Sequence, residues 1–266
     1  MKKFWGFLLV IVLMTSCGEY QSLLKSNDYN LVYKKAIEYY NKGDYQRAMN
    51  LLDGVRSVFV GQAKAQNIAY YRAFCSYNMK DYQIASDLFK QFIQTYSESS
   101  FAEECLYMMG FCDYKASPKP RLDQQVTEKA IREFQLYLSR YPYSMRKDKV
   151  NTYMDEMRDK LSYKAYLSAK NYYLREHYKA AVISLQNCLK DYPGSKYREE
   201  IMYMLFVSKY QMAVNSVEDK KVERYNNARE EYYYFADEYP NSRYAADVKK
   251  MYEDIEAYLE NYKFED

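Results

Sequence analysis

His177 is the only histidine in this 266-residue sequence, so catalysis by a Ser–His or Cys–His pair would depend on this one residue. A histidine general base acts on a nucleophile placed beside it, and no nucleophile motif accompanies His177. Asp44 and Asp81 stand at the corresponding place in two related stretches of the sequence, before a Tyr and an Ala. We therefore expect His177 to be a turn residue rather than a catalyst.

The acidic residues do not indicate a catalytic site either. Pairs such as Glu103-Glu104 and Glu199-Glu200 are adjacent, so their side chains diverge around a helix and suit a solvated face. The seven glycines form no phosphate-binding loop. We predict that the protein is not an enzyme, and that it has no catalytic residue and no cofactor.

The cysteines beyond position 17 are spaced for neither a metal site nor a disulfide within one helix. Cys105 and Cys112 are two helical turns apart, which is too far for a bridge between them. Cys75 falls on the equivalent helix of a neighbouring repeat, so a bridge to Cys105 or to Cys112 stays open, as does the state of Cys188. Buried free thiols are the alternative, because Cys packs like a small apolar residue. With a single histidine, we predict no zinc or other metal site.

Cys17 follows a short apolar stretch that begins at Phe4, after Lys2 and Lys3, and ends at Met14. The stretch is too short to span a bilayer and is typical of a secretory signal. A Cys directly after small residues resembles the bacterial lipobox, although Met14 stands where Leu is usual. The resemblance implies cleavage before Cys17 and acyl chains, such as palmitate, on the mature N-terminus. An ordinary signal peptide or an uncleaved anchor is the alternative.

Tyrosines seven residues apart recur five times, and residues at this spacing share one helix face. The first members of successive pairs are 37 residues apart, except for one interval of 59. The pairs are Tyr33 and Tyr40, Tyr70 and Tyr77, Tyr107 and Tyr114, Tyr166 and Tyr173, and Tyr203 and Tyr210.

Two further marks follow the same register. Alanines recur where two helices of a pair cross, because a small residue allows close approach, and a turn signal such as Gly43-Asp44 separates the helices. Each unit then ends in an aromatic residue, usually followed by Pro and Ser, which stop one helix and cap the next. The predicted crossing alanines are Ala48, Ala85, Ala130, Ala181 and Ala228, and the predicted helix pairs start near Asn30, Lys64, Phe101, Ser162 and Glu199.

These marks resemble the tetratricopeptide (TPR) repeat over residues 30–250. The resemblance implies an all-α fold: a right-handed α-solenoid of about five TPR-like helix pairs, closed by a capping helix over residues 242–262. We predict a signal peptide at 1–16, a lipidated tether at 17–29 and repeats 1–3 at 30–144. An extended or extra helix, repeats 4 and 5 and the capping helix occupy 145–266.

The resemblance also implies a binding surface, because the first helix of each TPR unit lines the concave face. Tyrosine offers a large contact area and a polar tip at low entropic cost, which suits peptide binding. The alternative is that these rings only pack between repeats. The candidates for a peptide groove are Tyr33, Tyr40, Tyr70, Phe74, Tyr77, Tyr107 and Tyr114.

A lipoprotein signal followed by five such units resembles the BamD (YfiO) family of outer-membrane assembly lipoproteins. The family implies a lipid-anchored scaffold of the β-barrel assembly machinery, at the outer membrane and facing the periplasm. Its N-terminal half would bind unfolded outer-membrane proteins, and its C-terminal half the periplasmic domains of the barrel insertase. Gly18, with no retention Asp after Cys17, favours the outer membrane.

Two other functions stay open from the sequence. One is a cell-envelope TPR lipoprotein that coordinates division or peptidoglycan synthesis. The other is a glycan-binding uptake lipoprotein, although Trp5, the only tryptophan, is removed with the signal. Loss of Lys2 and Lys3 lowers the formal charge from +3 to about +1, and the chain has no Arg-rich block, so we expect no nucleic-acid partner.

We predict that Cys17 is the mature N-terminus and carries lipid. Mass spectrometry of the purified mature protein should find an acylated Cys17, and Cys17→Ser should release a folded protein from membranes. An unmodified Cys17, or cleavage at another residue, would exclude this form of anchoring.

Overall fold

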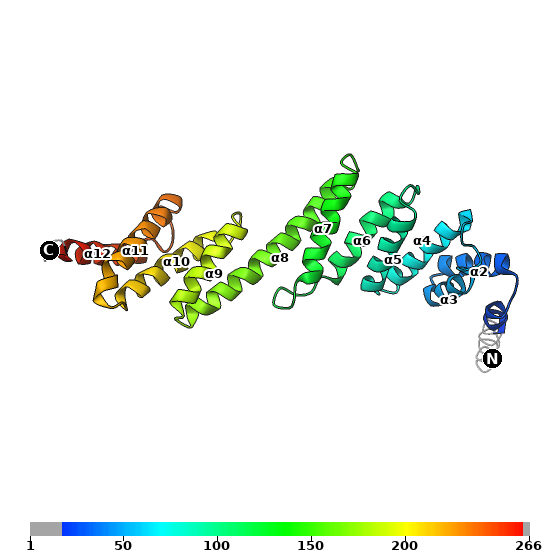
Figure 1. The fold of residues 1–266 in the computed structure, drawn as a ribbon, viewed down its shortest axis with the longest axis horizontal. Helices are drawn as coiled ribbons and strands as arrows, with labels where there is room; N and C mark the ends of the chain where they lie inside the picture. Colours follow the sequence, from blue (N-terminus) through cyan, green and yellow to red (C-terminus); the bar gives the residue numbers. More distant parts are fainter. Residues whose placement is uncertain (1–17, 263–266) are drawn as a thin grey trace, which may run out of the picture. The chain divides into compact units, whose positions relative to one another are not determined.

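The computed structural model describes residues 18–262, which are helical without a β-strand in that range (Figure 1). The predicted signal peptide and Cys17 lie outside these residues. The all-α fold of TPR-like helix pairs, with α12 as the terminal capping helix, is as predicted. The helices are α2 (Tyr29–Asn41), α3 (Tyr45–Val55), α4 (Ala63–Asn78), α5 (Tyr82–Thr95), α6 (Ala102–Ala116), α7 (Gln125–Arg140), α8 (Lys147–Leu174), α9 (Tyr178–Asp191), α10 (Arg198–Val214), α11 (Glu218–Glu238) and α12 (Ala245–Tyr262).

The chain forms two compact units that meet within α8, between residues 157 and 158. Unit 1 contains the pairs α2–α3, α4–α5 and α6–α7 and the first part of α8. Unit 2 contains the rest of α8 with α9, the pair α10–α11, and α12. The sequence placed the division at 144/145 instead, because Pro142 ends a repeat there. From residue 147 on, the charged segment 145–161, for which an extension and a separate helix were both open, belongs to the single 28-residue helix α8.

Small residues mark the crossing of the helices in each pair, and all five predicted alanines are fully buried. Their partners Ala36, Ala73 and Ala169 on the first helices are fully buried as well. In the third pair this position is Gly110 of α6, which packs against the ring of Phe134 on α7. A Cβ atom on Gly110 would lie 2.9 Å from Cδ1 of Phe134, closer than atoms pack. The crossing therefore requires a small side chain or none.

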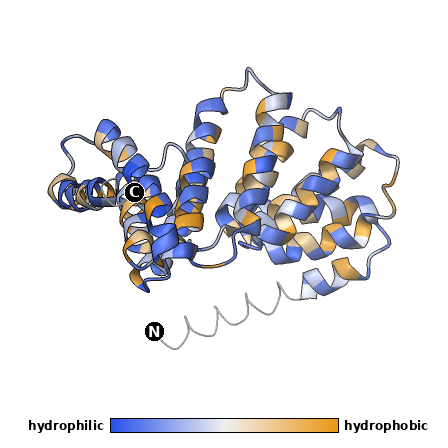
Figure 2. Ribbon diagram, turned by 60° about the vertical axis from the view of Figure 1, so that its left-hand side comes forward, coloured by the Kyte–Doolittle hydropathy of each residue, from blue (hydrophilic) through white to orange (hydrophobic). Residues whose placement is uncertain are grey.

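Second helices bury one stripe of side chains and leave the other faces polar. In α5, Ala85, Phe89 and Phe92 fall three or four residues apart and are buried, which is the spacing of one helix face. Figure 2 shows this mixed character, with hydrophobic and hydrophilic residues on each of the helices. The buried stripes form the cores of the two units.

The turns inside three of the five pairs, α2–α3, α4–α5 and α8–α9, share one conformation. Gly43, Lys80 and Glu176 have positive φ angles of 81°, 68° and 60°, and the next residue begins the second helix. Asp44 is that residue in repeat 1, where its carboxylate accepts a hydrogen bond from the Arg47 amide at 3.3 Å. His177, the N-cap of α9, has nearly the same backbone angles as Asp44, so it is the turn residue that the sequence indicated.

The turns after α5, α7, α9 and α11 are closed by a serine hydroxyl, whereas the α3–α4 turn ends at Gln62, which makes no side-chain capping bond. In each, the serine Oγ accepts a hydrogen bond from the backbone N–H two residues later, just before or at the start of the next helix. This confirms that the Tyr-Pro-x-Ser ends separate the repeats. The four pairs are Ser99 with Phe101, Ser144 with Arg146, Ser195 with Tyr197, and Ser242 with Tyr244.

The segment predicted as a tether differs from expectation, since residues 18–24 are helical and pack against the first repeat. Tyr20 and Leu23 are buried in the core of α2 and α3. The Asn50 amide donates a hydrogen bond to the Tyr20 hydroxyl at 3.0 Å, and Lys35 Nζ lies 3.0 Å from Glu19. The polar composition of the segment concealed these contacts, because they depend on partners about 30 residues away.

We predict that Gly110→Ala destabilises unit 1, by a net amount on the order of 1 kcal/mol in the free energy of unfolding. Overpacking against Phe134 should outweigh the better helix propensity of alanine. Gly54→Ala is the matched control, because Gly54 lies in α3 with nothing within 4 Å of an added Cβ. It should stabilise the protein slightly in the same urea titration. Equal stability of the two variants would show that the α6–α7 crossing can relax.

Candidate functional site

Nine aromatic rings of unit 1 form one connected series, which we call the aromatic row. It passes from α2 through α4 and α6 to the first part of α8, so it joins successive repeats. Its consecutive ring centroids lie 4.4–6.4 Å apart, which is the usual range for interacting aromatic pairs. The members are Tyr40, Tyr71, Tyr70, Phe74, Tyr77, Phe111, Tyr107, Tyr114 and Tyr153.

The row contains six of the seven groove candidates. Tyr33 is the exception, since its ring packs edge-on against Phe59 in the α3–α4 turn, 6.1 Å away. Tyr71, Phe111 and Tyr153 belong to the row but were not among the candidates. The sequence does not indicate Tyr153, because this residue lies in the segment that interrupts the repeat, outside the 37-residue spacing.

Most rings of the row are half-buried, so they pack between repeats and also reach the surface. Tyr107 is only 8% exposed and belongs to the core, where it offers little to a ligand. Phe74, Tyr77 and Tyr114 are more accessible. The packing and the binding interpretations therefore apply to different members of the row.

Two hydroxyl groups of the row donate hydrogen bonds to carboxylates of the next repeat. Tyr70 donates to Glu104 at 2.9 Å, and Tyr114 donates to Glu156. Burial first and then the Glu104 bond raise the pKa of Tyr70, and the Glu156 bond with burial raises the pKa of Tyr114 to about 12. Both hydroxyls therefore stay protonated and hold adjacent first helices together.

Unit 2 repeats this arrangement with fewer aromatic rings. Lys170 Nζ bridges the Tyr166 hydroxyl at 2.9 Å and Glu200 at 2.8 Å, and these partners raise the pKa of Lys170. Tyr210 donates to Asp254 at 3.2 Å. Lys170 follows the first tyrosine of its pair by four residues, and unit 1 has Phe74 and Phe111 at this position. A cation thus replaces these aromatic rings in unit 2.

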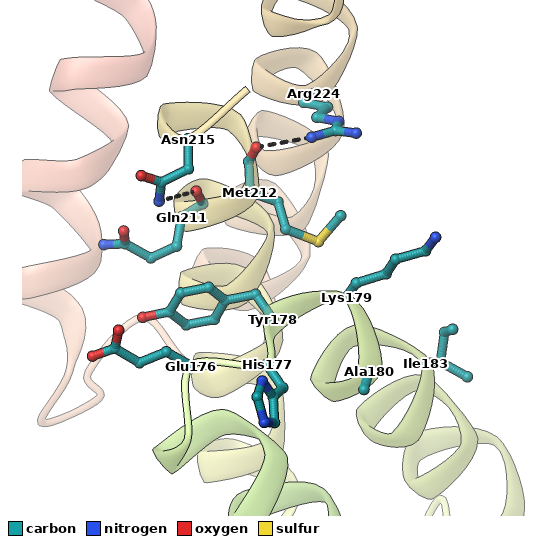
Figure 3. Close-up of a pocket in the computed structure, with 10 residues that line it drawn as sticks. All are labelled: Glu176, His177, Tyr178, Lys179, Ala180, Ile183, Gln211, Met212, Asn215 and Arg224. Atoms are coloured by element: carbon teal, nitrogen blue, oxygen red, sulfur yellow. Dashed lines mark hydrogen bonds between the residues drawn. The ribbon is translucent and has the colours of Figure 1, made fainter. Parts of the chain in front are cut away.

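A hollow of about 600 Å³ in unit 2 is lined by the α8–α9 turn, the end of α10 and the beginning of α11 (Figure 3). His177 comes from the turn, Lys179 from the beginning of α9 and Met212 from α10. Arg224 Nη1 donates to the Met212 carbonyl at 3.3 Å and to the Ser216 hydroxyl at 2.6 Å, so it serves to cap α10. The lining holds no Ser, Thr or Cys side chain that His177 could activate.

A buried polar cluster lies among α5, α6 and α7. Lys129 Nζ lies 2.9 Å from Asp113 and 3.7 Å from Glu133, and the Ser86 hydroxyl donates to Asp113 at 3.0 Å. Burial and the hydrogen bond to Asp113 raise the pKa of Glu133 to about 8. Lys129 thus faces two buried carboxylates and, at 3.8 Å, the exposed Asp87, and Glu133 is held in its protonated form.

The same place in repeat 5 has a simple ion pair. Glu231 follows its crossing alanine, Ala228, by three residues, as Glu133 follows Ala130. Glu231 pairs there with Lys209, which stands where repeat 3 has Asp113. The cluster in repeat 3 therefore has a structural role in the core of unit 1, and the hollow of Figure 3 belongs to unit 2.

All four described cysteines are free and buried, so neither of the two conceivable disulfides is present. Between residues 18 and 262 no three His, Cys, Asp or Glu side chains gather to hold a metal ion. Among the same residues, none of the helices combines the length and the apolar character needed to cross a membrane.

The family comparison matches nearly the whole described chain. The sequence model of YfiO, described as an outer membrane lipoprotein, matches residues 25–200 and again residues 164–265. No protein of curated function shows significant sequence similarity to the chain.

Solved structures of helical-repeat proteins are similar at low identity. A TPR repeats protein from Bacteroides fragilis is 12% identical with a TM-score of 0.42, and the match covers 87% of this chain and 99% of that one. The TPR2AB domain of yeast Sti1, in a complex with pHSP90, is 14% identical with a TM-score of 0.39, covering 86% and 98%. The human IFIT1 dimer with PPP-AAAA is 17% identical with a TM-score of 0.31, covering 89% and 59%. These values are too low to indicate a shared function.

We predict that the buried cluster makes stability depend on pH. Because the folded state raises the pKa of Glu133 from 4.5 to about 8, the protonated form of this group stabilises the fold. The contribution is full below 4.5, falls as pH rises from 4.5 to about 8, and is gone above that. Glu133→Gln keeps the neutral form. It should stabilise the protein at about pH 8, by on the order of 1–3 kcal/mol, and change little at about pH 5.

Urea unfolding at the two pH values measures this difference. Glu231→Gln is the contrasting control, because it removes the partner of Lys209 and should destabilise the fold at both pH values. A pH-independent effect of Glu133→Gln would contradict the assignment of a protonated Glu133.

Proposed function

The chain belongs to the YfiO family of outer-membrane lipoproteins, and we propose that it is a lipid-anchored scaffold of the β-barrel assembly machinery. In this proposal Cys17 carries the lipid and the helical repeats face the periplasm. Unit 1 binds segments of unfolded outer-membrane proteins, and unit 2 binds the periplasmic domains of the barrel insertase. This assignment of the two halves follows the division of roles that the family resemblance implies.

The aromatic row is the observation that supports substrate binding by unit 1. Its half-buried rings, among them Phe74, Tyr77 and Tyr114, provide adjacent faces on successive helices. Such faces stack with aromatic side chains of an extended peptide, and barrel proteins carry aromatic residues in their terminal segments. Rings already fixed by packing lose little further freedom on binding, which favours affinity.

The hydroxyl groups restrict how such a peptide binds. Tyr70 and Tyr114 already donate to Glu104 and Glu156, so they are not free donors for a peptide backbone. Tyr77 has no hydrogen-bond partner among the described residues, while its ring contacts Phe74, Tyr82 and Phe111. We infer that ring faces supply most of the affinity and that Tyr77 supplies the available hydroxyl.

The test replaces Tyr77 and leaves its counterpart in unit 2 as the control. Tyr77→Ser, combined with Tyr70→Phe, should weaken binding of an aromatic-containing peptide from a barrel-protein terminus by about tenfold. Tyr210 is the second tyrosine of its pair in repeat 5, as Tyr77 is in repeat 2. Tyr210→Ser should leave peptide binding unchanged. Binding of the insertase's periplasmic domains should persist in the unit 1 variant. Far-ultraviolet circular dichroism and the melting temperature verify that each variant is folded.

The possible results separate the two parts of the proposal. Unchanged peptide binding in a folded Tyr70→Phe/Tyr77→Ser protein would show that the aromatic row has only a structural role. Failure of the unaltered protein to bind insertase domains, in contrast, removes the assembly function itself.

A further inference from the structure

The α7–α8 turn displays two large apolar side chains to solvent. Tyr143 is 97% exposed and Met145 is 102% exposed, the highest values among the large hydrophobic residues described. Ser144 between them faces inward. The other three serine-closed turns carry small or polar residues at both positions: Glu98, Gly194 and Asn241 correspond to Tyr143, and Ser100, Lys196 and Arg243 correspond to Met145.

The turn is held rigidly beneath these side chains. The Ser144 hydroxyl accepts from the Arg146 amide at 3.2 Å, lies 2.6 Å from a Glu103 carboxylate oxygen and meets the Tyr137 hydroxyl. The Arg146 guanidinium lies 4.9 Å from the centre of the Tyr107 ring. None of these contacts needs Tyr143 or Met145. Because the turn is already ordered, docking there would incur little loss of conformational entropy.

The charge around the turn points to the kind of partner. Residues 140–149 include four basic residues and one acid, Asp148. The corresponding stretch of the α5–α6 turn, residues 95–104, contains three acids and no basic residue. Lys147 and Lys149 are exposed beside the apolar pair. Glu103 and Glu104 of α6 lie against Ser144 and Arg146 beneath the turn, so the positive charge free for a partner is that of the two lysines. An exposed aromatic and a methionine beside two lysines complement an apolar pocket with an acidic rim.

We propose that the α7–α8 turn is a docking site for a folded, acidic protein domain, with Tyr143 and Met145 as anchors in its apolar pocket. A protein is favoured over the bilayer because the turn and residues 18–24 lie at opposite edges of unit 1 (Figures 1 and 2). This step rests on the proposed lipid anchor at Cys17, which places residues 18–24 on the membrane side. The docked domain is distinct from an unfolded substrate on the aromatic row.

Photo-crosslinking in the bacterium tests the site in the full-length protein. A benzophenone amino acid at position 143 should give one major protein adduct, and mass spectrometry should place the linked peptide beside an apolar, acid-rimmed pocket. The same probe at position 98, the exposed counterpart in the α5–α6 turn, should not give that adduct. Adducts with lipid alone, with a second copy of this chain or with unfolded barrel proteins would overturn the proposal, as would the absence of any adduct specific to position 143.

The purified partner then provides a quantitative measurement with Cys17→Ser protein. Tyr143→Ser/Met145→Ser should weaken its binding by about tenfold and leave the melting temperature unchanged. Lys147→Glu/Lys149→Glu should weaken binding mainly at low salt, because screening already reduces the attraction at high salt. Leu122→Ser, at another exposed apolar residue of unit 1, is the control and should bind normally. Full affinity in both double variants would refute docking at this turn.

Discussion

The structure depends first on the close crossing of two helices at small residues. Ala36 and Ala48, like Ala73 and Ala85, are fully buried, and Gly110 leaves no space for a Cβ atom against Phe134. This contact fixes the distance and register of the first four helix pairs, whereas in the fifth the first helix has the buried Phe206 at this position. Every other repeating feature, including the serine-closed turns and the tyrosines of the first helices, takes its position from that register.

Contacts between successive pairs use polar groups together with apolar packing. The Tyr70–Glu104 and Tyr114–Glu156 hydrogen bonds join first helices that are neighbours in the stack. The same rings form the aromatic row, so a single residue stabilises the repeat and contributes to the candidate surface. Substitution of one of these tyrosines therefore reports on binding only when the folding of the variant is measured as well.

Much of this fold could be predicted because its signals are periodic. Each capping serine follows its crossing alanine by 14 residues, and His177 precedes Ala181 by 4 residues, as Asp44 precedes Ala48. These fixed separations within a unit reveal the helix pairs without knowledge of any contact. Features that depend on a single distant partner could not be predicted this way. Tyr20 packs on a repeat that begins after it, Tyr33 turns toward Phe59 rather than the row, and Glu133 meets Asp113 twenty residues away. The row of aromatic rings was therefore predicted in outline, but its membership required the structure, and its role as a peptide groove stays a prediction.

The docked segment at residues 18–24 affects how the protein could move on a membrane. Tyr20 is fixed in the core of the first repeat, so a lipid on Cys17 would be joined to it by residues 17–19 alone. Three residues reach about 10 Å only when extended, whereas Gly18 and Glu19 are already helical and Glu19 is held by Lys35. A linker this short leaves the first repeat almost no freedom to swing or to rise from the headgroups. The lipid would then be joined to unit 1 by a rigid connection instead of a flexible linker. This connection would set the height above the membrane at which unit 1 meets a partner.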